Sequence, residues 1–293
     1  MSTRMTVAVT GALGFVASHL LPRLEAGGAR VIAIARPGRD VTAIERVRIE
    51  VRRADLSDRT GLASAFTGAD AVVHLAGMAL VPGMLPALVV ARVSRGVFIG
   101  SAGVYTKLAS PGAEAKRAGE AGLRASPLAY TLLRPSMIYG TPRDRNLARL
   151  LRWIRRCPVV PIPGGGATPQ QPVHVEDLCA AIVAALERPA AARGEYDVGG
   201  PEAIELREMI HLAGHALGRR VWLMPVPLGP GRAAAVLARR LGLPFPVSPE
   251  QVLRLQESKA VNIAPARRDL GFAPRPFAQG IAAEARLLWP EEA

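Results

Sequence analysis

Short apolar runs alternate with stretches of helical periodicity along the first half of the chain. Runs of β-branched and apolar residues predict buried strands at 6–10, 30–35, 49–53, 71–77, 96–100 and 130–134. After the first run, apolar residues recur at the spacing of one helix face, at Phe15, Val16, Leu20, Leu21 and Leu24. Pro22 lies inside this helix and cannot donate to the carbonyl of Ser18, so it predicts a kink or an early end. Strands that alternate with helices predict an α/β fold built on a doubly wound parallel sheet.

A glycine-spaced turn at 11–17 joins the first predicted strand to the first predicted helix. Gly11 permits a tight turn, Gly14 lets the backbone approach a pyrophosphate, and Ala17 suits the packing of helix on strand. The helix then offers free N–H groups and the positive end of its dipole to phosphates. Strand, turn and helix together predict dinucleotide binding, although a turn that binds nothing has the same outline. The turn residues expected to contact the cofactor are Gly11, Leu13, Gly14, Phe15 and Val16.

The ends of the next predicted strands carry groups that would select the cofactor. An acidic residue after the second strand takes a ribose 2′-hydroxyl in such folds, whereas arginine suits a 2′-phosphate. Arg36 and Arg39 occupy that position and favour NADP, with NAD as the alternative and a solvated strand end as the simpler interpretation. Asp55 could reach the adenine, or cap a helix that begins near Ser57. Further expected cofactor contacts, at or after strand ends, are Leu56, Leu75, Ala76, Gly77 and Pro135.

Composition narrows the class of protein. The chain of 293 residues is 49% hydrophobic and 21% charged, enough for one large domain or two modest ones. No apolar run reaches the length of a membrane span, and a strand begins within the first six residues. We therefore expect no membrane partner and a cytoplasmic location. Cys157 and Cys179 lack metal-ligand spacing and are interpreted as buried free thiols.

No metal site is expected. Glu208, His211 and His215 share one face of a predicted helix, but their spacing is not that of a zinc motif. We interpret them as surface or capping residues.

The net charge of +13, with a pI near 11.1, indicates an anionic partner. Nucleic acid is one candidate, but the basic residues are scattered and almost all are arginine, as a coding bias would leave them. Aromatic residues make up only 4% of the chain, too few for stacking platforms on single strands. Nucleic acid is therefore not an expected partner, and the positive field would favour an anionic cofactor or substrate.

Segments along nearly the whole chain resemble the extended and atypical short-chain dehydrogenase/reductase families, which include nucleotide-sugar epimerases and dehydratases. They are TGALGFVASHL at 10–20, ADL at 54–56, VVHLAG at 72–77, VFIGSAGVY at 97–105, LRPSMIYG at 133–140, QPVHVEDLCAAI at 171–182, YDVGGPEAIELREM at 196–209 and RRDLGFAPRPFAQGI at 267–281. The resemblance implies a dinucleotide-binding Rossmann domain at 1–138, joined by returning segments 174–188 and 195–199. It also implies a smaller, mainly substrate-binding lobe at 139–293. The stretch 158–172, rich in proline and glycine, predicts a long loop in that lobe.

The resemblance also implies a catalytic Ser, Tyr and Lys, the last two spaced Y-x-x-x-K. One helical turn separates such a pair, so the ammonium favours the phenolate, while the Ser hydroxyl polarises a carbonyl. Ser101 and Lys116 occupy the Ser and Lys positions, but Gly112 occupies the Tyr position. The usual proton-transfer residue is therefore absent. Tyr105 is the best substitute and Tyr139 the next, although Tyr105 could instead be a packing residue at a strand end.

Three functional hypotheses follow. The first is an NADP-linked oxidoreductase or epimerase-like enzyme acting on a sugar nucleotide or small carbonyl substrate, with Ser101, Tyr105 and Lys116 as catalytic residues. The second is a protein that binds NADP(H) without turnover, as a sensor or a regulatory or assembly protein. The third is a basic nucleic-acid binder. We expect a monomer or a homodimer, and the sequence does not select the substrate.

Overall fold

The computed structural model describes residues 5–45, 49–58, 61–144, 146–227, 229 and 257–290. The chain forms two compact units, each assembled from separate segments. The first comprises Met1–Pro135, Glu176–Val198 and Asn262–Ala273, and the second comprises Ser136–Val175, Gly199–Val261 and Pro274–Ala293. The segment 262–273, which sequence analysis assigned to the second lobe, lies in the first unit because it packs beside the last sheet strand. There, Arg188 Nη1 donates to the carbonyl of Asp269 at 2.9 Å.

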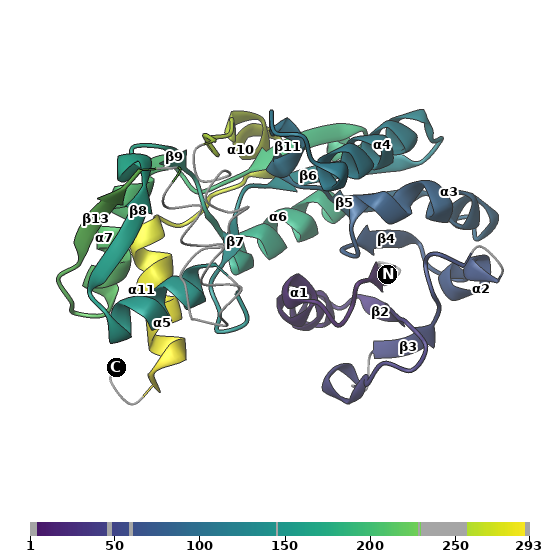
Figure 1. Cartoon of the computed structure of the whole chain (residues 1–293). Helices are drawn as coiled ribbons and strands as arrows, with labels where there is room; N and C mark the ends of the chain where they lie inside the picture. Colours follow the sequence, from purple (N-terminus) through teal and green to yellow (C-terminus); the bar gives the residue numbers. More distant parts are fainter. Residues whose placement is uncertain are drawn as a thin grey trace. The chain divides into compact units, whose positions relative to one another are not determined.

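The first unit is built on a seven-stranded parallel sheet in the order β11-β6-β5-β4-β1-β2-β3 (Figure 1). Its strands are β1 (Thr6–Thr10), β2 (Arg30–Ala35), β3 (Ile49–Arg53), β4 (Ala71–His74), β5 (Arg95–Ile99), β6 (Ala129–Pro135) and β11 (Gly194–Val198). The predicted doubly wound parallel sheet is confirmed. The predicted strand at 71–77 ends early, at His74, because a glycine turn begins there.

Helices lie on both faces of this sheet (Figure 1). They are α1 (Phe15–Ala26), α2 (Leu62–Phe66), α3 (Val81–Val90), α4 (Pro111–Ala125), α6 (Val175–Glu187) and α10 (Ala264–Leu270). Helices α2, α3 and α4 form one layer, in which α4 packs so closely that a methyl group on Gly119 would lie 2.0 Å from the carbonyl oxygen of Met78. On the other face, His19 of α1 contacts Glu176 of α6 at 2.5 Å.

Helix α1 continues through Pro22 to Ala26, so the predicted early end is wrong. A proline inside a helix costs about 3 kcal/mol. Leu20, Leu21 and Leu24 are buried along the same helix, and each such side chain stabilises the fold by about 1.5–3 kcal/mol. Burial of the apolar face therefore outweighs the missing hydrogen bond.

In its described residues, the second unit combines small sheets with three helices packed around one apolar core. Its strands are β7 (Ile138–Tyr139), β8 (Val159–Pro163), β9 (Pro169–Gln170), β10 (Val173–His174), β12 (Ile204–Glu205) and β13 (Trp222–Val226). Its helices are α5 (Leu147–Arg156), α7 (Leu206–Ala216) and α11 (Phe277–Leu288). In the part of the chain that the structure describes, no helix is long and apolar enough to cross a membrane.

The long loop predicted at 158–172 is wrong, because β8 and β9 lie within it. Within the described segments, strand β8 pairs only with β13, in a two-stranded sheet, so Pro161 has no second described strand to hydrogen-bond. Val160 and Ile162 alternate with it and are buried in the core. Proline content misled the prediction because edge strands tolerate it.

Candidate functional site

The turn between β1 and α1 is built around two glycines. Gly11 has a φ of +68°, and a side chain there would lie 2.9 Å from backbone atoms of Leu75 and Ala76, so only glycine fits. Gly14 donates its N–H to the carbonyl of Gly11 at 2.9 Å. Gly14 also precedes α1, whose first turn has no side-chain cap and no acidic residue. The first N–H groups of α1 are therefore open to an anion, and the turn lies against residues 75–76.

His74 fixes the neighbouring turn. Its side chain is fully buried, with Nδ1 2.8 Å from Thr10 Oγ1 and Nε2 2.9 Å from the carbonyl oxygen of Gly77. Burial lowers the pKa of His74 to about 4, so the ring is neutral at pH 7. A carbonyl only accepts, so Nε2 carries the proton and Nδ1 accepts from the Thr10 hydroxyl. The ring thereby holds the 75–77 turn to the end of β1.

Arg36 and Asp55 lie next to each other at the ends of β2 and β3, where Ala54 donates its N–H to the Ala35 carbonyl at 2.9 Å. Asp55 Oδ1 accepts from the Ser57 N–H at 2.9 Å and from Ser57 Oγ at 2.6 Å. These hydrogen bonds, and the charge of Arg36, lower the pKa of Asp55. Asp55 closes a local turn and does not cap a helix at Ser57, since the next helix begins at Leu62. The Arg36 side chain is exposed.

The side chains of Ser101 and Lys116 both approach Gly103, which lies in the short helical turn that follows β5. Ser101 Oγ accepts the N–H of Gly103 at 3.1 Å. A methyl group on Gly103 would lie 3.1 Å from Ser101 Oγ and 3.7 Å from Lys116 Nζ. The hydroxyl and the ammonium therefore lie on the same side of this glycine, although 15 positions separate them in sequence.

Gly112 lies one helical turn before Lys116 in α4, the spacing of side chains on one face. It is exposed, and a Cβ atom there would have Ser110 Oγ, at 3.9 Å, as its nearest neighbour. Crowding therefore does not exclude a tyrosine at this position.

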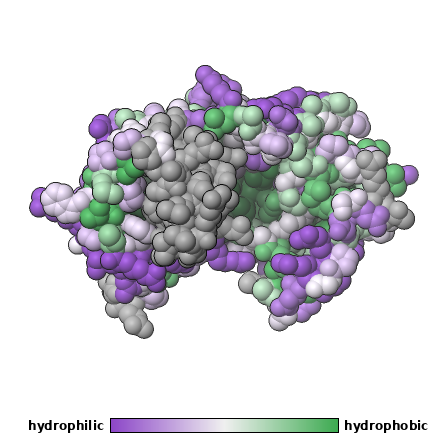
Figure 2. Space-filling model, in the orientation of Figure 1, coloured by the Kyte–Doolittle hydropathy of each residue, from purple (hydrophilic) through white to green (hydrophobic). Residues whose placement is uncertain are grey.

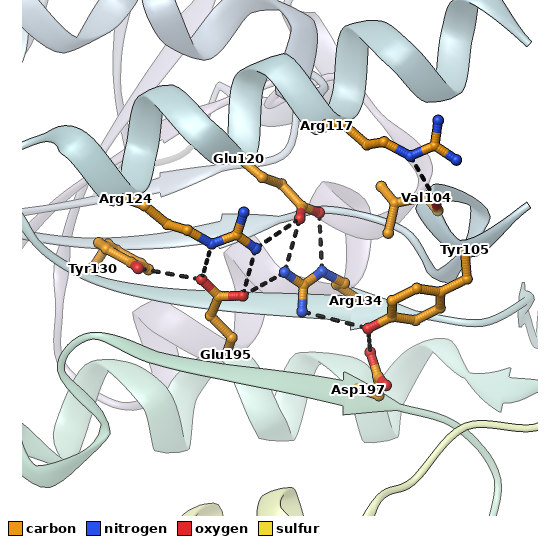
Figure 3. A network of polar contacts seen from close by, with 9 residues as sticks. All are labelled: Val104, Tyr105, Arg117, Glu120, Arg124, Tyr130, Arg134, Glu195 and Asp197. Carbon is orange, nitrogen blue, oxygen red and sulfur yellow. Dashed lines mark hydrogen bonds and ion pairs between the residues drawn. The ribbon is translucent and has the colours of Figure 1, made fainter.

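Tyr105 points toward β6 and β11. Its hydroxyl donates to Asp197 Oδ1 at 2.8 Å and accepts from Arg134 Nη1 at 3.5 Å (Figure 3). Burial, then the bond to Asp197, raises the pKa of Tyr105 to about 12, and burial also raises the pKa of Asp197. The contacts described for Tyr105 do not join it to Ser101 or Lys116. As a proton-transfer group it could donate but would not ionise near pH 7.

Tyr139 occupies a packing position. It is fully buried in the second unit, with its ring centroid 5.3 Å from those of both His174 and Phe277. It is therefore a weaker substitute for the missing tyrosine than Tyr105.

Two arginines and two glutamates form a network beside Tyr105, in which Arg134 and Glu120 are buried and Arg124 and Glu195 are partly exposed (Figure 3). Arg134 donates to Glu120 from Nε at 3.0 Å and from Nη2 at 2.8 Å, and to Glu195 at 2.5 Å. Arg124 donates twice to Glu195, at 2.6 and 2.7 Å. Arg124, then Arg134, holds the pKa of Glu195 at about 2. Because the guanidinium of Arg134 is hydrogen-bonded to these two carboxylates, it is poorly placed to bind a substrate anion.

The remaining predicted contacts differ in accessibility. Leu13, Phe15 and Val16 and the whole 75–77 turn are partly exposed, whereas Leu56 and Pro135 are buried. Cys179 is buried, as predicted, and burial raises the pKa of its thiol to about 12, while Cys157 is partly exposed. The described segments contain no group of three His, Cys, Asp or Glu residues placed to hold a metal.

A protein-family model described as NAD(P)H-binding matches residues 11–189. That span starts at the glycine of the β1–α1 turn and includes Arg36, Asp55, Ser101 and Lys116. The chain belongs to the NAD(P)H-binding family. The resemblance to short-chain dehydrogenases/reductases and epimerases is confirmed by this match and by the solved structures that share the fold.

Two of the relatives that the chain resembles in sequence are named as reductases. The ceramide reductase of Caulobacter vibrioides is 28% identical over 237 residues, which covers 76% of this chain and 74% of the relative. The dTDP-4-dehydro-6-deoxy-D-allose reductase of Streptomyces bikiniensis is 26% identical over 294 residues, covering 81% and 88%. A third relative is NADH dehydrogenase [ubiquinone] 1 alpha subcomplex subunit 9, mitochondrial, of Arabidopsis thaliana. It is 33% identical over 150 residues, covering 50% of this chain and 36% of that protein.

The fold matches that of MoeE5, solved in complex with UDP-glucose and NAD. The TM-score is 0.76 at 22% identity, covering 98% of this chain and 100% of MoeE5. The UDP-glucose 4-epimerase of Thermotoga maritima matches with a TM-score of 0.75 at 18% identity, covering 99% and 100%.

Sequence analysis missed two features of the site. His74 stood within a quoted segment, but its tautomer depends on Thr10, 64 residues away. Asp197 gave no sequence signal, because only the register of β11 against β6 brings it beside Arg134.

Proposed function

We propose that this protein is an NADP(H)-dependent oxidoreductase or epimerase-like enzyme that acts on a sugar nucleotide or a small carbonyl compound. The observation that carries the proposal is the approach of both Ser101 Oγ and Lys116 Nζ to Gly103, in the unit that also holds the glycine turn. The reductase activities in the names of two relatives, and the UDP-glucose and NAD bound by MoeE5, support it. NADP(H) would supply or accept the hydride, and Ser101 would hydrogen-bond the substrate oxygen.

The chain's own groups fit such a cofactor. The backbone of the Gly11–Val16 turn, with its glycine-only conformation and uncapped helix start, would hold the pyrophosphate. Arg36 would bind the 2′-phosphate and Lys116 the nicotinamide ribose. A thermal-shift comparison of NADP, NADPH, NAD and UDP-sugars tests the whole assignment. Stabilisation by a dinucleotide is the expected result, and the absence of any shift would overturn it.

The Arg36→Asp variant is expected to abolish or invert a preference for NADP(H) over NAD(H). A charge-assisted contact with the 2′-phosphate contributes about 1.5–3 kcal/mol, or roughly tenfold and upward in affinity. Asp55 lies alongside, so a second carboxylate would repel the phosphate further. Titration of both cofactors measures the preference. Arg92→Asp, which makes the same charge change at another exposed arginine, should keep it. Equal affinities in the parent protein would rule out the NADP assignment.

The Lys116→Met variant is expected to weaken NADPH binding by roughly tenfold or more, because methionine keeps the apolar stem and loses the charged donor. Lys107→Met, at an exposed lysine, is the matched control. Gly112→Tyr should create or raise reductase activity only while Lys116 is present, since a phenolate needs the neighbouring cation. A double-mutant cycle measures this coupling. Unchanged NADPH affinity in Lys116→Met would show that this helix is wrongly aligned with the family.

Ser101→Ala and Tyr105→Phe are each expected to suppress turnover, by on the order of a hundredfold, and to leave cofactor affinity nearly intact. Because the pKa of Tyr105 is raised to about 12, the phenol stays protonated near pH 7 and could give a proton to a reduced carbonyl. Steady-state rates over a carbonyl panel, with NADPH affinity measured in parallel, test both variants. Full activity in Tyr105→Phe would show that Tyr105 takes no part in catalysis and only hydrogen-bonds Asp197 and Arg134.

A protein that binds NADP(H) without turnover is the second candidate. Gly112 in the tyrosine position favours it, and so does the relative that is a subunit of an NADH dehydrogenase. Cofactor binding with no hydride transfer across the carbonyl panel would favour this candidate over the enzyme.

A further inference from the structure

One surface of the second unit combines arginines with exposed apolar side chains. We call it the arginine–tryptophan face and define it by Arg156, Val159, Arg220, Trp222 and Met224. Its residues come from α5, from the start of β8, and from β13 with the residues before it.

Helix α5 supplies one cationic part of this face. Leu147, Leu151 and Ile154 are buried in the core of the second unit, so the opposite side of the helix is exposed, and it carries Arg152 and Arg156. No acidic residue occurs in the sequence between Asp144 and Glu176. Arg152 donates to the Pro142 carbonyl at 2.9 Å and its charge acts on Glu284, so Arg156, at the end of α5, is the arginine that this helix adds to the face.

Strand β13 and the residues before it supply the second cationic part of the face, together with exposed apolar side chains. The described chain from Glu208 to the end of β13 contains no further acidic residue, and Arg220 is exposed two positions before Trp222. The register of β8 and β13 places Trp222 opposite Val159. Trp222 is 65% exposed, Met224 50% and Val159 38%, whereas the alternate residue Val160 is buried. Hydrophobic residues therefore lie beside hydrophilic ones over β8 and β13 (Figure 2).

We propose that the arginine–tryptophan face docks on an anionic phospholipid surface. Arginines beside headgroup phosphates and an indole at the boundary with the acyl chains are the arrangement that such a surface favours. The expectation of no membrane partner rested on the lack of an apolar run long enough to span, and a peripheral contact needs no such run. This inference is independent of the proposed cofactor function.

The apolar residues decide between lipid and nucleic acid. A sugar–phosphate backbone attracts the arginines but offers nothing to the side chains of Val159 and Met224. Binding of single strands by stacking requires successive exposed aromatic side chains. Trp222 is exposed, whereas Trp153, which donates to the Val159 carbonyl at 3.1 Å, is only partly exposed. The lipid surface satisfies both the charge and the exposed apolar atoms.

Sedimentation of the full chain with vesicles tests the proposal. Vesicles of phosphatidylcholine alone are compared with an equal mixture of phosphatidylcholine and phosphatidylglycerol. Binding is expected for the mixed vesicles and is expected to fall steeply with added salt. The Arg156→Gln/Arg220→Gln variant should lower the partition coefficient by roughly fivefold per arginine removed. Trp222→Ser should lower it as well, without changing the salt dependence.

The control removes the same charge elsewhere. Arg92→Gln/Arg267→Gln lowers the net charge equally through exposed arginines of the first unit, and it should bind like the parent. Unfolding curves establish that each variant is folded. The proposal is overturned by equal binding to both vesicle types, by no binding to either, or by equal losses in the two double variants. Binding of a duplex DNA probe that depends on Arg156 and Arg220, without vesicle binding, would instead assign the face to nucleic acid.

Discussion

Replacing Glu284 by glutamine is expected to raise the free energy of unfolding by about 3 kcal/mol at pH 7. Glu284 is fully buried in α11, where Oε2 accepts the N–H of Gly140 at 3.0 Å. Oε1 has no hydrogen-bond partner among the described residues. Burial, then the charge of Asp144, raises the pKa of Glu284 from 4.5 to about 8. Glutamine keeps an acceptor for Gly140 and cannot ionise.

The Glu284→Gln variant is expected to be the more stable protein at pH 7 because the folded and unfolded states of the parent hold the Glu284 proton over different pH ranges. Above pH 4.5 the unfolded chain has released the Glu284 proton, while the folded chain retains it up to about pH 8. The contribution of Glu284 to the free energy of unfolding of the parent protein is therefore highest below pH 4.5, and it falls by about 1.4 kcal/mol per pH unit between pH 4.5 and about pH 8. Parent and variant should have equal stability near the lower pH and diverge toward the higher.

Denaturant unfolding across this pH range measures the difference. Glu208→Gln, at an exposed glutamate of α7, is the matched control and should follow the parent. A constant offset between parent and Glu284→Gln at every pH would show that the carboxyl group is ionised in the folded protein.

Replacing Arg134 by methionine is expected to lower the free energy of unfolding by about 3–5 kcal/mol. Its guanidinium lies between Glu120, which is 3% exposed, and Glu195. Without it, the Glu120 carboxylate would stay buried and lose its two-point partner. The loss should be larger above the pKa of the carboxyl groups than in acid, where protonation removes the unpaired charge.

Arg124→Met is the control for Arg134→Met, because Arg124 also contacts both glutamates but its side chain is 47% exposed. An exposed pair contributes about 1 kcal/mol or less. Adding Glu120→Gln to Arg134→Met should recover part of the stability. Equal losses in the two single variants would show that burial does not set the strength of this network.

Local sequence patterns predicted six of the seven strands of the first unit. The seventh, β11, is not an apolar run, and its segment was expected only from the family resemblance. The glycine turn was predictable because strand, turn and helix are contiguous. The second unit was harder. Its strands are short and lie at edges, where proline is tolerated, so Pro161 can occupy β8. The proline content predicted a loop at this segment, but β8 pairs with β13 there.

In the candidate site too, some residues could be predicted from the sequence and others could not. Ser101 and Lys116 could be assigned from the family resemblance, and the structure places both beside Gly103. The partners of Tyr105 could not be assigned, because Asp197 comes from a strand 92 positions later in the sequence. The role of Arg134 could not be predicted either, because its partners Glu120 and Glu195 lie far from it in the sequence.

Because the first unit is assembled from separate segments of the chain, its sheet strands leave the ribosome at different times during synthesis. Strand β6 ends at Pro135, but β11, which covers its outer edge, begins only at Gly194. At about 5–20 residues per second, a ribosome needs roughly three to twelve seconds to supply the intervening chain. Throughout that interval β6 is an open parallel edge, able to pair with another nascent chain, and Arg134 awaits Glu195. Rapid overproduction crowds such unfinished chains together, so weaker expression, which keeps fewer nascent chains in the cell at one time, should increase the fraction of correctly folded protein.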